Sequence, residues 1–221
     1  MHSRNFFVFL AFIAMAFLPF RLAQAEDKAS VLAKLDAAAK DFHTATANFK
    51  FDNIQTDPVP DTDTLSGTAY YERDGHFEMA AHITAHNGKP ASRGYIFSGG
   101  TLRISDTGKE KDAKPYAAAS KYESYLRLGF GASGKDLAEE WDITYLGKET
   151  IDGVATDKLE LIAKDPNVLK LFHKVIIWLD TAHAVSLKQV FDEGEGQSFV
   201  CTYTNIKLDQ ALPKNAFSFD K

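Results

Sequence analysis

KASVLAKLDAAAKDFHTATANF, residues Lys28 to Phe49, is the stretch that organises this chain, because its helical pattern is long and clear. Apolar side chains recur there at intervals of three and four residues, which places them on one face of a helix. Polar residues such as Lys34, Lys40 and Asp41 mostly fall on the other face. We therefore predict one amphipathic helix over residues 28–49 that buries its apolar stripe. The stripe consists of Val31, Leu32, Leu35, Ala38, Ala39, Phe42 and Ala45.

The rest of the chain reads as short strands separated by turns. Residues 52–64 are polar with two prolines and predict a loop. Alternating residues then predict strands at 65–73 and 76–85, with hairpin turns at Asp74-Gly75 and Asn87-Gly88. Further strands are expected at 93–98, 101–105, 141–146, 155–163, 174–180, 185–191 and 198–206, before a closing segment, 213–219.

This pattern gives about nine to eleven antiparallel strands, paired mostly with their neighbours in sequence. A sheet of that width has to twist and curl. We therefore predict an α+β, mainly β fold. In it a strongly curved antiparallel sheet forms an incomplete barrel, or half-barrel, closed by the long N-terminal helix and a short helical lid.

The predicted lid is residues 116–130, YAAASKYESYLRLGF, which interrupt the strands. Ala118, Tyr122, Tyr125 and Leu126 make a short helical stripe, and the glycines that follow permit a mobile connection. An ordinary connector packed on the sheet edge is the alternative. Ser133 is a candidate cap for one helical turn over residues 136–140.

Residues 1–25 have the pattern of a secretory signal peptide. Arg4 precedes an apolar run over residues 6–18, and Ala23-Gln24-Ala25 has the small-x-small form of a cleavage site. We expect cleavage after Ala25, which leaves one domain, residues 26–221, in the periplasm. An uncleaved N-terminal anchor is the alternative, although the run is shorter than the roughly 20 residues of a spanning helix.

Composition narrows the partners and the redox chemistry. The full chain carries a net charge of −5, and removal of residues 1–25 makes it more negative by two arginines. The sequence has no basic patch, so we do not predict that it binds nucleic acid. Cys201 is the one cysteine, so no intramolecular disulfide can form, and we expect a buried, inert thiol.

No motif in the sequence indicates catalysis, a metal or a cofactor, so we do not expect an enzyme. His82 and His86 are four residues apart, but on a strand they would be solvated rather than joint metal ligands. Asp61 and Asp63 lack the further oxygen ligands of a calcium loop. A hydrolase that uses residues distant in sequence is left open.

The sheet carries more inward apolar and aromatic residues than one helix can cover. It therefore predicts an apolar cavity, although the same alternation is how any sheet core looks. Acyl chains bind by burial, at about 0.8 kcal/mol per methylene, and leave no polar signature in sequence. The N-terminal helix is expected to form a fixed wall of this cavity. The candidate lining residues are Leu32, Leu35, Phe42, Tyr71, Phe77, Met79, Tyr95, Phe97, Tyr125, Leu126, Trp178, Leu187, Phe199 and Tyr203.

The order of these parts resembles the periplasmic outer-membrane lipoprotein carrier (LolA-like) family, as a divergent member. The resemblance runs through TAYYERDGHFEM, YIFSGGTLRI, ITYLGKETIDGVATDKLELIAKD, KVIIWLDTAHAVSLKQVFDEGEG and YTNIKLDQALPKNAFSF, and covers essentially the whole mature chain. It implies an incomplete barrel lidded by helices around an apolar cavity for acyl chains. In that family an Arg-Pro-x-x-Phe turn supplies an arginine that helps to hold the lid. Arg73 and Phe77 match that turn, and Asp74 stands in place of the proline.

The resemblance implies a monomeric periplasmic carrier of acylated lipoproteins or lipids, with an inner-membrane release complex and an outer-membrane acceptor as partners. It implies no cofactor. A second hypothesis is an envelope-stress sensing module of the same fold, which acts through a protein partner.

Overall fold

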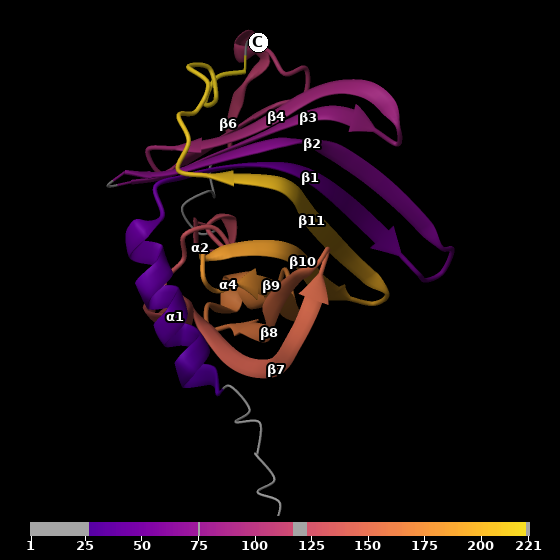
Figure 1. The fold of residues 1–221 in the computed structure, drawn as a ribbon. Coiled ribbons are helices and arrows are strands. Elements are labelled where there is room, and N and C mark those ends of the chain that lie inside the picture. Colours follow the sequence, from indigo (N-terminus) through magenta and orange to yellow (C-terminus); the bar gives the residue numbers. More distant parts are fainter. Residues whose placement is uncertain (1–26, 75, 117–122, 220–221) are drawn as a thin grey trace, which may run out of the picture.

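A computed structural model describes residues 27–74, 76–116 and 123–219 (Figure 1). The predicted signal peptide, together with Ala118 and Tyr122 of the predicted lid, lies outside the described residues. Within the described ranges, no helix combines the length and the apolar character needed to cross a membrane.

The strands form one eleven-stranded antiparallel sheet in the order β6-β5-β4-β3-β2-β1-β11-β10-β9-β8-β7. The predicted mainly β architecture with an N-terminal helix is therefore confirmed. The sheet is open, because no ladder joins β6 to β7 in the described part of the chain. The strands are β1 Thr44–Gln55, β2 Asp61–Asp74, β3 His76–His86, β4 Lys89–Ser98, β5 Thr101–Ser105, β6 Lys114–Tyr116, β7 Trp141–Ile151, β8 Val154–Ala163, β9 Lys174–Asp180, β10 Val185–Gly194 and β11 Gln197–Leu208.

The strand order makes the connection between β6 and β7 unusual. The first and last strands, β1 and β11, pair at the centre of the sheet. Strands β2 to β6 step outward to one edge, and β7 to β10 return from the other edge. The connection after β6 must therefore pass from one edge of the sheet to the other. Figure 1 shows its helix α2, Glu123–Leu126, between the two halves of the sheet.

The N-terminal helix α1 is shorter than predicted and spans Lys28–Asp41. Asp27 caps its start by accepting a hydrogen bond from the backbone of Ser30 at 2.8 Å, and Phe42 is already extended. The predicted helix over residues 28–49 is therefore wrong after Asp41. Residues 44–49 belong to β1, because threonines there favour a strand and Ala45 and Ala47 alternate into the core.

Two other predicted boundaries are also corrected. Most of the predicted loop over residues 52–64 is strand, because β1 and β2 pair as far as Gln55 and Asp61. Strand β7 continues past the predicted end at residue 146 to Ile151, and its hairpin turn is Asp152-Gly153. A bulge between Tyr145 and Gly147 breaks the apolar alternation there, so sequence periodicity alone ended the strand too early.

Short helices complete the connections. The η1 turn, Glu110–Asp112, precedes β6, and α4, Pro166–Leu169, follows β8. Helix α3, Gly134–Glu140, leads into β7. The predicted cap at Ser133 is confirmed, because its hydroxyl accepts from the backbone of Asp136 at 3.0 Å in a capping box.

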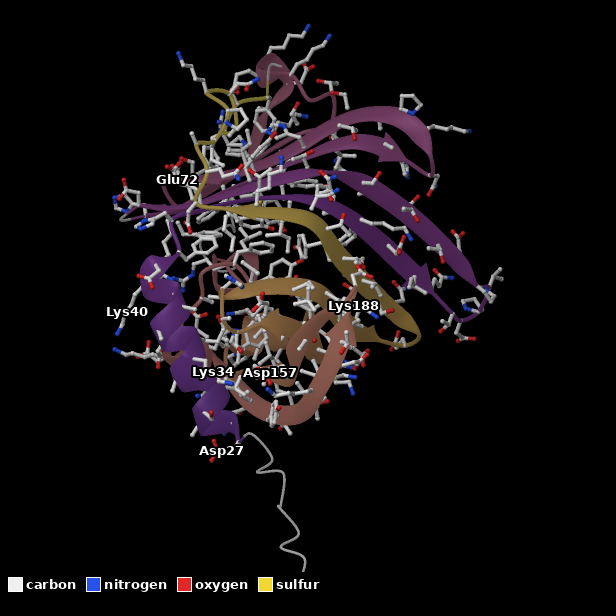
Figure 2. The ribbon with its side chains drawn as sticks, in the orientation of Figure 1. Asp27, Lys34, Lys40, Glu72, Asp157 and Lys188 are labelled. Carbon is white, nitrogen blue, oxygen red and sulfur yellow. The ribbon has the colours of Figure 1, made fainter. Side chains whose placement is uncertain are left out.

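The core lies mainly on one face of the sheet, where side chains fill the space between its two halves (Figure 2). One buried cluster joins α1 and α3 to β7–β10, and a second joins β1–β5 to Phe130. The C-terminal segment after β11 packs on the opposite face of β2–β4, where Phe219 and Ala216 are buried.

That C-terminal cover corrects the predicted solvation of His82. Its side chain is buried, and Nε2 lies 2.7 Å from the carbonyl oxygen of Ala216. His86 remains exposed and contacts Asp63 through Nε2 at 2.6 Å. The two histidines thus have separate partners, and the described residues hold no group of three or more possible metal ligands.

Candidate functional site

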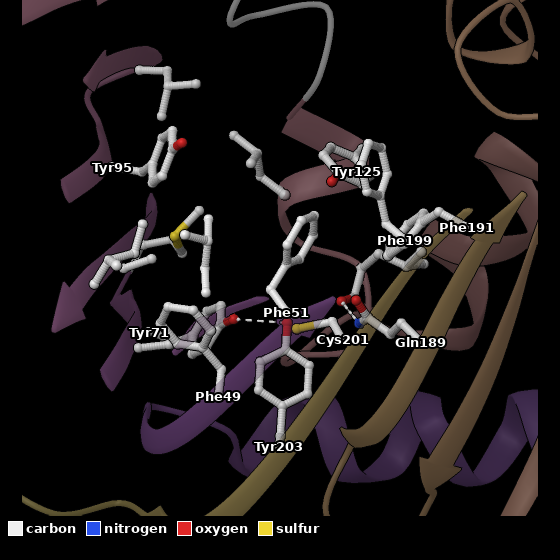
Figure 3. Close-up of a pocket in the computed structure, with 18 residues that line it drawn as sticks. Phe49, Phe51, Tyr71, Tyr95, Tyr125, Gln189, Phe191, Phe199, Cys201 and Tyr203 are labelled. Carbon is white, nitrogen blue, oxygen red and sulfur yellow. Dashed lines mark hydrogen bonds between the residues drawn. The ribbon is translucent and has the colours of Figure 1, made fainter. Parts of the chain in front are cut away.

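An apolar cavity of about 390 Å³ lies against the core-facing side of the sheet (Figure 3). Its lining comes from β1–β5, from β10 and β11, and from α2 with the segment after it. The lining residues are Phe49, Phe51, Leu65, Ala69, Tyr71, Met79, Ala81, Ile83, Tyr95, Leu102, Tyr125, Leu126, Leu128, Gln189, Phe191, Phe199, Cys201 and Tyr203.

Strand alternation and register bring these side chains together. Successive residues of a strand point to opposite faces, so Met79, Ala81 and Ile83 of β3 all face the cavity. Small side chains leave space above this part of the sheet, because Ala69 of β2 pairs with Ala47 of β1 on one side and with Ala81 of β3 on the other. Larger side chains at Ala69 and Ala81 would project into this space.

The polar groups of the cavity are few and uncharged at neutral pH. Burial raises the pKa of the Tyr71, Tyr125 and Tyr203 hydroxyls, and the hydroxyls of Tyr71 and Tyr203 lie 3.4 Å apart. Burial likewise raises the pKa of Cys201 to about 12, which leaves a protonated thiol of low reactivity. Together with the apolar lining, this suits an apolar ligand, and it offers no charged group to catalysis.

Gln189 is the one amide side chain in this lining. Its Nε2 donates to the carbonyl oxygen of Leu128 at 2.6 Å, so β10 holds the segment after α2. The same segment is tied to β10 by backbone bonds, from Ser186 to Gly129 at 2.6 Å and from Gly131 to Ala184 at 2.9 Å. Gly129 has a φ of +83°, and a Cβ there would lie 2.5 Å from the Cβ of Ser186. The close approach therefore requires glycine.

Aromatic rings fix the same segment to both halves of the sheet. Phe130 stacks on Tyr71 with ring centroids 3.8 Å apart and meets Tyr203 edge-on at 4.8 Å. The ring centroid of Tyr125 lies 5.2 Å from that of Phe172 and 5.1 Å from that of Phe191. These contacts close one side of the cavity with residues 125–131.

Arg73 contacts this closing segment from β2. Its guanidinium donates to the carbonyl oxygen of Gly131 and lies 3.4 Å from the Asp136 carboxylate. Burial works to raise the pKa of Asp136, but hydrogen bonds from Ser133 and the charges of Arg73 and Arg127 outweigh it and hold that pKa below its usual value. The arginine that the resemblance singled out is thus in contact with the segment after α2.

Half of the predicted lining residues line this cavity, namely Tyr71, Met79, Tyr95, Tyr125, Leu126, Phe199 and Tyr203. The others lie elsewhere. Leu32 and Leu35 pack in the cluster beneath α1, and Phe42 packs in the second core cluster. The expectation that α1 forms a cavity wall is not met, because α1 contributes no residue to this lining and packs on α3 and β7 instead.

Four further positions differ for reasons of register and neighbourhood. Trp178 was predicted to face inward, but Val175, Ile177 and Leu179 take the inner face of β9. The Trp178 ring lies on the outer face between the ammonium groups of Lys158 and Lys188, at 4.7 and 4.8 Å.

Leu187 sits at a bulge between Ser186 and Lys188 and does not line the cavity. Phe77 and Phe97 pack against each other beside the cavity, with ring centroids 6.1 Å apart, and line a neighbouring pocket.

Sequence reasoning missed several lining residues of β1 and β10. Phe49 was missed because the predicted helix ran over residues 28–49, and Phe51 was missed because it fell between that helix and the predicted loop over residues 52–64. The alternation in ATANFKF was the signal that could have placed them on one face of a strand. Gln189 was missed because a polar side chain within an apolar lining carries no pattern of its own.

No protein-family model and no curated protein matches the sequence. Solved structures match it in fold. MucB aligns with a TM-score of 0.52 at 15% identity, over 86% of this chain and 62% of MucB. The complex of MucA and MucB from Pseudomonas aeruginosa aligns at 0.50 and 15% identity, over 86% and 60%. A conserved protein from Thermus thermophilus aligns at 0.52 and 10% identity, over 86% and 91%.

These matches are distant, and at such identities they concern the fold alone. A LolA superfamily protein from Nitrosomonas europaea also matches, at 16% identity over 87% of this chain and 97% of that one. Its TM-score is 0.42. The predicted resemblance is therefore one of fold, which the matches to MucB and to the Thermus thermophilus protein show at a distance.

Proposed function

We propose that this chain is a periplasmic carrier that binds acyl chains of lipoproteins or lipids in the apolar cavity and carries them toward the outer membrane. The observation that carries the proposal is a cavity of about 390 Å³ with an apolar, uncharged lining. The volume falls in the range of about 300–1,000 Å³ that is typical of small-molecule sites.

Burial alone can supply the affinity that such a carrier needs. Ten methylenes transferred from water would contribute about 8 kcal/mol. That free energy corresponds to a Kd of about 1 μM, before the cost of ordering ligand and protein is subtracted. A ligand held in this way can be released again without a covalent step.

The segment of residues 125–131 is the proposed lid, with Arg73 as its latch. It closes one side of the cavity, and its contacts to the sheet are a few rings and hydrogen bonds. In this proposal the sheet acts as the strongly curved incomplete barrel, the lid closes it, and α1 supports the lid without lining the cavity. An inner-membrane release complex would load the monomeric carrier, and an outer-membrane acceptor would unload it.

The proposal is tested by extraction of a labelled lipoprotein or fatty acid from vesicles, with native mass spectrometry of the bound species. Ala81→Phe is the informative variant, because its new ring projects into the cavity. We expect extraction to fall at least about tenfold, since the space for several methylenes is lost. Ala155→Phe, at an exposed position of β8, is the matched control and should extract normally. A wild-type protein that extracts nothing and carries no lipid would refute the proposal.

A second candidate function is sensing through a protein partner. It is favoured by the fold shared with MucB, which forms a complex with MucA in Pseudomonas aeruginosa. This chain would then report cavity occupancy to an envelope protein. Affinity purification that recovers one membrane protein in stoichiometric amount, released or captured when lipid is added, would support sensing over carriage.

A further inference from the structure

A second, basic pocket of about 470 Å³ adjoins the apolar cavity. Three basic residues, two phenylalanines and two glycines line it, and no acidic side chain is among its described lining residues. The residues are Arg73, His76, Phe77, Phe97, Gly99, Gly100 and Arg127. The pocket therefore differs in chemistry from the cavity, whose lining is uncharged.

Strand register shows that the two spaces are neighbours. Phe97 of the basic pocket pairs with Met79 on β3 and with Leu102 on β5, and both of those residues line the cavity. Two consecutive residues of the proposed lid also line the two spaces, because Leu126 lines the cavity and Arg127 lines the basic pocket. The rings of Phe77 and Phe97, 6.1 Å apart, stand at the boundary.

The basic pocket can supply hydrogen bonds to an anion. Each guanidinium has five N–H donors. Arg127 directs one toward Glu140 at 2.9 Å, and Arg73 contacts Gly131 and Asp136, so both retain donors for a ligand. Neither of these carboxylates lines the pocket. An anionic group next to the mouth of the cavity would thus meet cationic donors without a facing acid.

The cavity volume limits how much chain can enter. At about 30 Å³ for a group the size of a water molecule, 390 Å³ holds about thirteen methylene-sized groups. That is one medium-length acyl chain. This volume suits one such chain better than the two chains of a phospholipid.

We propose that the cavity and the basic pocket together select a singly acylated amphiphile with an anionic head, carboxylate or phosphate. The chain occupies the apolar cavity, and the head lies between Arg73 and Arg127. This inference rests on the proposed lipid-binding function and names its ligand class.

Gly99 offers a variant that changes the pocket's charge and leaves both arginines in place. It has a φ of +56° in the turn between β4 and β5, and no atom lies within 4 Å of a Cβ added there. Both aspartate and asparagine tolerate that left-handed conformation. Gly99→Asp and Gly99→Asn therefore form a pair of nearly equal shape that differs in one negative charge.

The experiment measures the affinities of tetradecanoate, tetradecyl phosphate and tetradecan-1-ol for the full mature chain by displacement of a fluorescent fatty acid. We expect at least one anionic probe to bind about tenfold more tightly than the alcohol. The better of the two anions then tells whether a carboxylate or a phosphate is the natural head. Gly99→Asp should weaken the anions about fivefold more than Gly99→Asn does. Gly153→Asp, in the turn between β7 and β8 and outside both linings, is the control and should leave the affinities of all three probes unchanged.

Several results would overturn the inference. They are equal affinities for the alcohol and both anions, an equal loss for all three probes in Gly99→Asp, or tighter uptake of a phospholipid from ditetradecanoyl phosphatidylglycerol vesicles than of either single-chain anion. If the alcohol binds and the head group makes no difference, this inference fails and the proposed carrier function stands. If no probe binds, the alcohol included, the proposed function itself fails.

Discussion

Phe130 packs the proposed lid against the sheet, and Phe130→Ala measures how much this packing contributes to the free energy of unfolding. The ring is 1% exposed, stacks on Tyr71 at 3.8 Å and meets Tyr203 edge-on at 4.8 Å. Replacing a buried phenylalanine by alanine costs about 3–5 kcal/mol, which includes the aromatic contacts. For a chain of this length, that loss lowers Tm by about 10 °C.

The assay is urea unfolding followed by circular dichroism, together with amide hydrogen exchange of residues 129–131 and of Ser186. Tyr116→Ala is the control, because this aromatic side chain is 45% exposed and should cost under about 1 kcal/mol. We expect faster exchange at Gly131, whose amide donates to Ala184, and at Ser186, whose amide donates to Gly129. A loss below about 1 kcal/mol for Phe130→Ala would refute the reasoning, because the segment would then add nothing to the folded core.

Three further predictions concern charge, reactivity and register. The pKa of Asp136 lies below its usual value, so this carboxylate contributes stability that is present above the unfolded pKa of about 3.9 and is lost as pH falls through the folded pKa. Asp136→Asn should therefore flatten the acid side of the profile of unfolding free energy against pH. Parallel profiles for the variant and the wild type would contradict this. Cys201, with a pKa raised to about 12, should react with iodoacetamide more slowly than an unfolded control by at least about tenfold at pH 8, and fast alkylation of the native protein would show an accessible thiolate. Trp178→Phe should leave lipid affinity unchanged, because the ring lies on the outer face over Lys158 and Lys188, whereas a loss of binding would return Trp178 to the cavity.

The sequence predicts most strands because alternation reports a half-buried sheet directly. The hairpin dipeptides fix their ends, and Asn87-Gly88 forms a turn with both residues at positive φ, 48° and 71°. The prediction is wrong where the same residues fit both the helical period and the alternation of a strand. Ala45 fits the helical stripe of α1 and the alternation of β1 alike, so the helix is extended into the strand. Extended backbone at Phe42 decides between them, and no residue pattern marks it.

The cavity is less predictable than the sheet because it depends on contacts between distant segments. Whether an inward aromatic residue lines space or fills it is set by its neighbour on the next strand. Phe97 faces the same side as Met79, but it packs against Phe77 and leaves the cavity to others. The alanines 69 and 81 leave room only because β2 and β3 bring them opposite each other. Such pairings follow from register, and a slip of one residue would turn each of these side chains to the other face of the sheet.

The role of α1 changes accordingly. Its backbone carbonyl at Leu32 approaches Gly134 so closely that a Cβ there would lie 2.1 Å from it, and Asp36 accepts a hydrogen bond from the backbone of Lys135 at 2.9 Å. Helix α1 thus binds α3, which directly follows the proposed lid. A lid held at this end by α1 and α3 would open from its α2 end, where the Tyr125 ring contacts Phe172 and Phe191. The helix predicted as a wall of the cavity is better understood as the support that limits how the cavity opens.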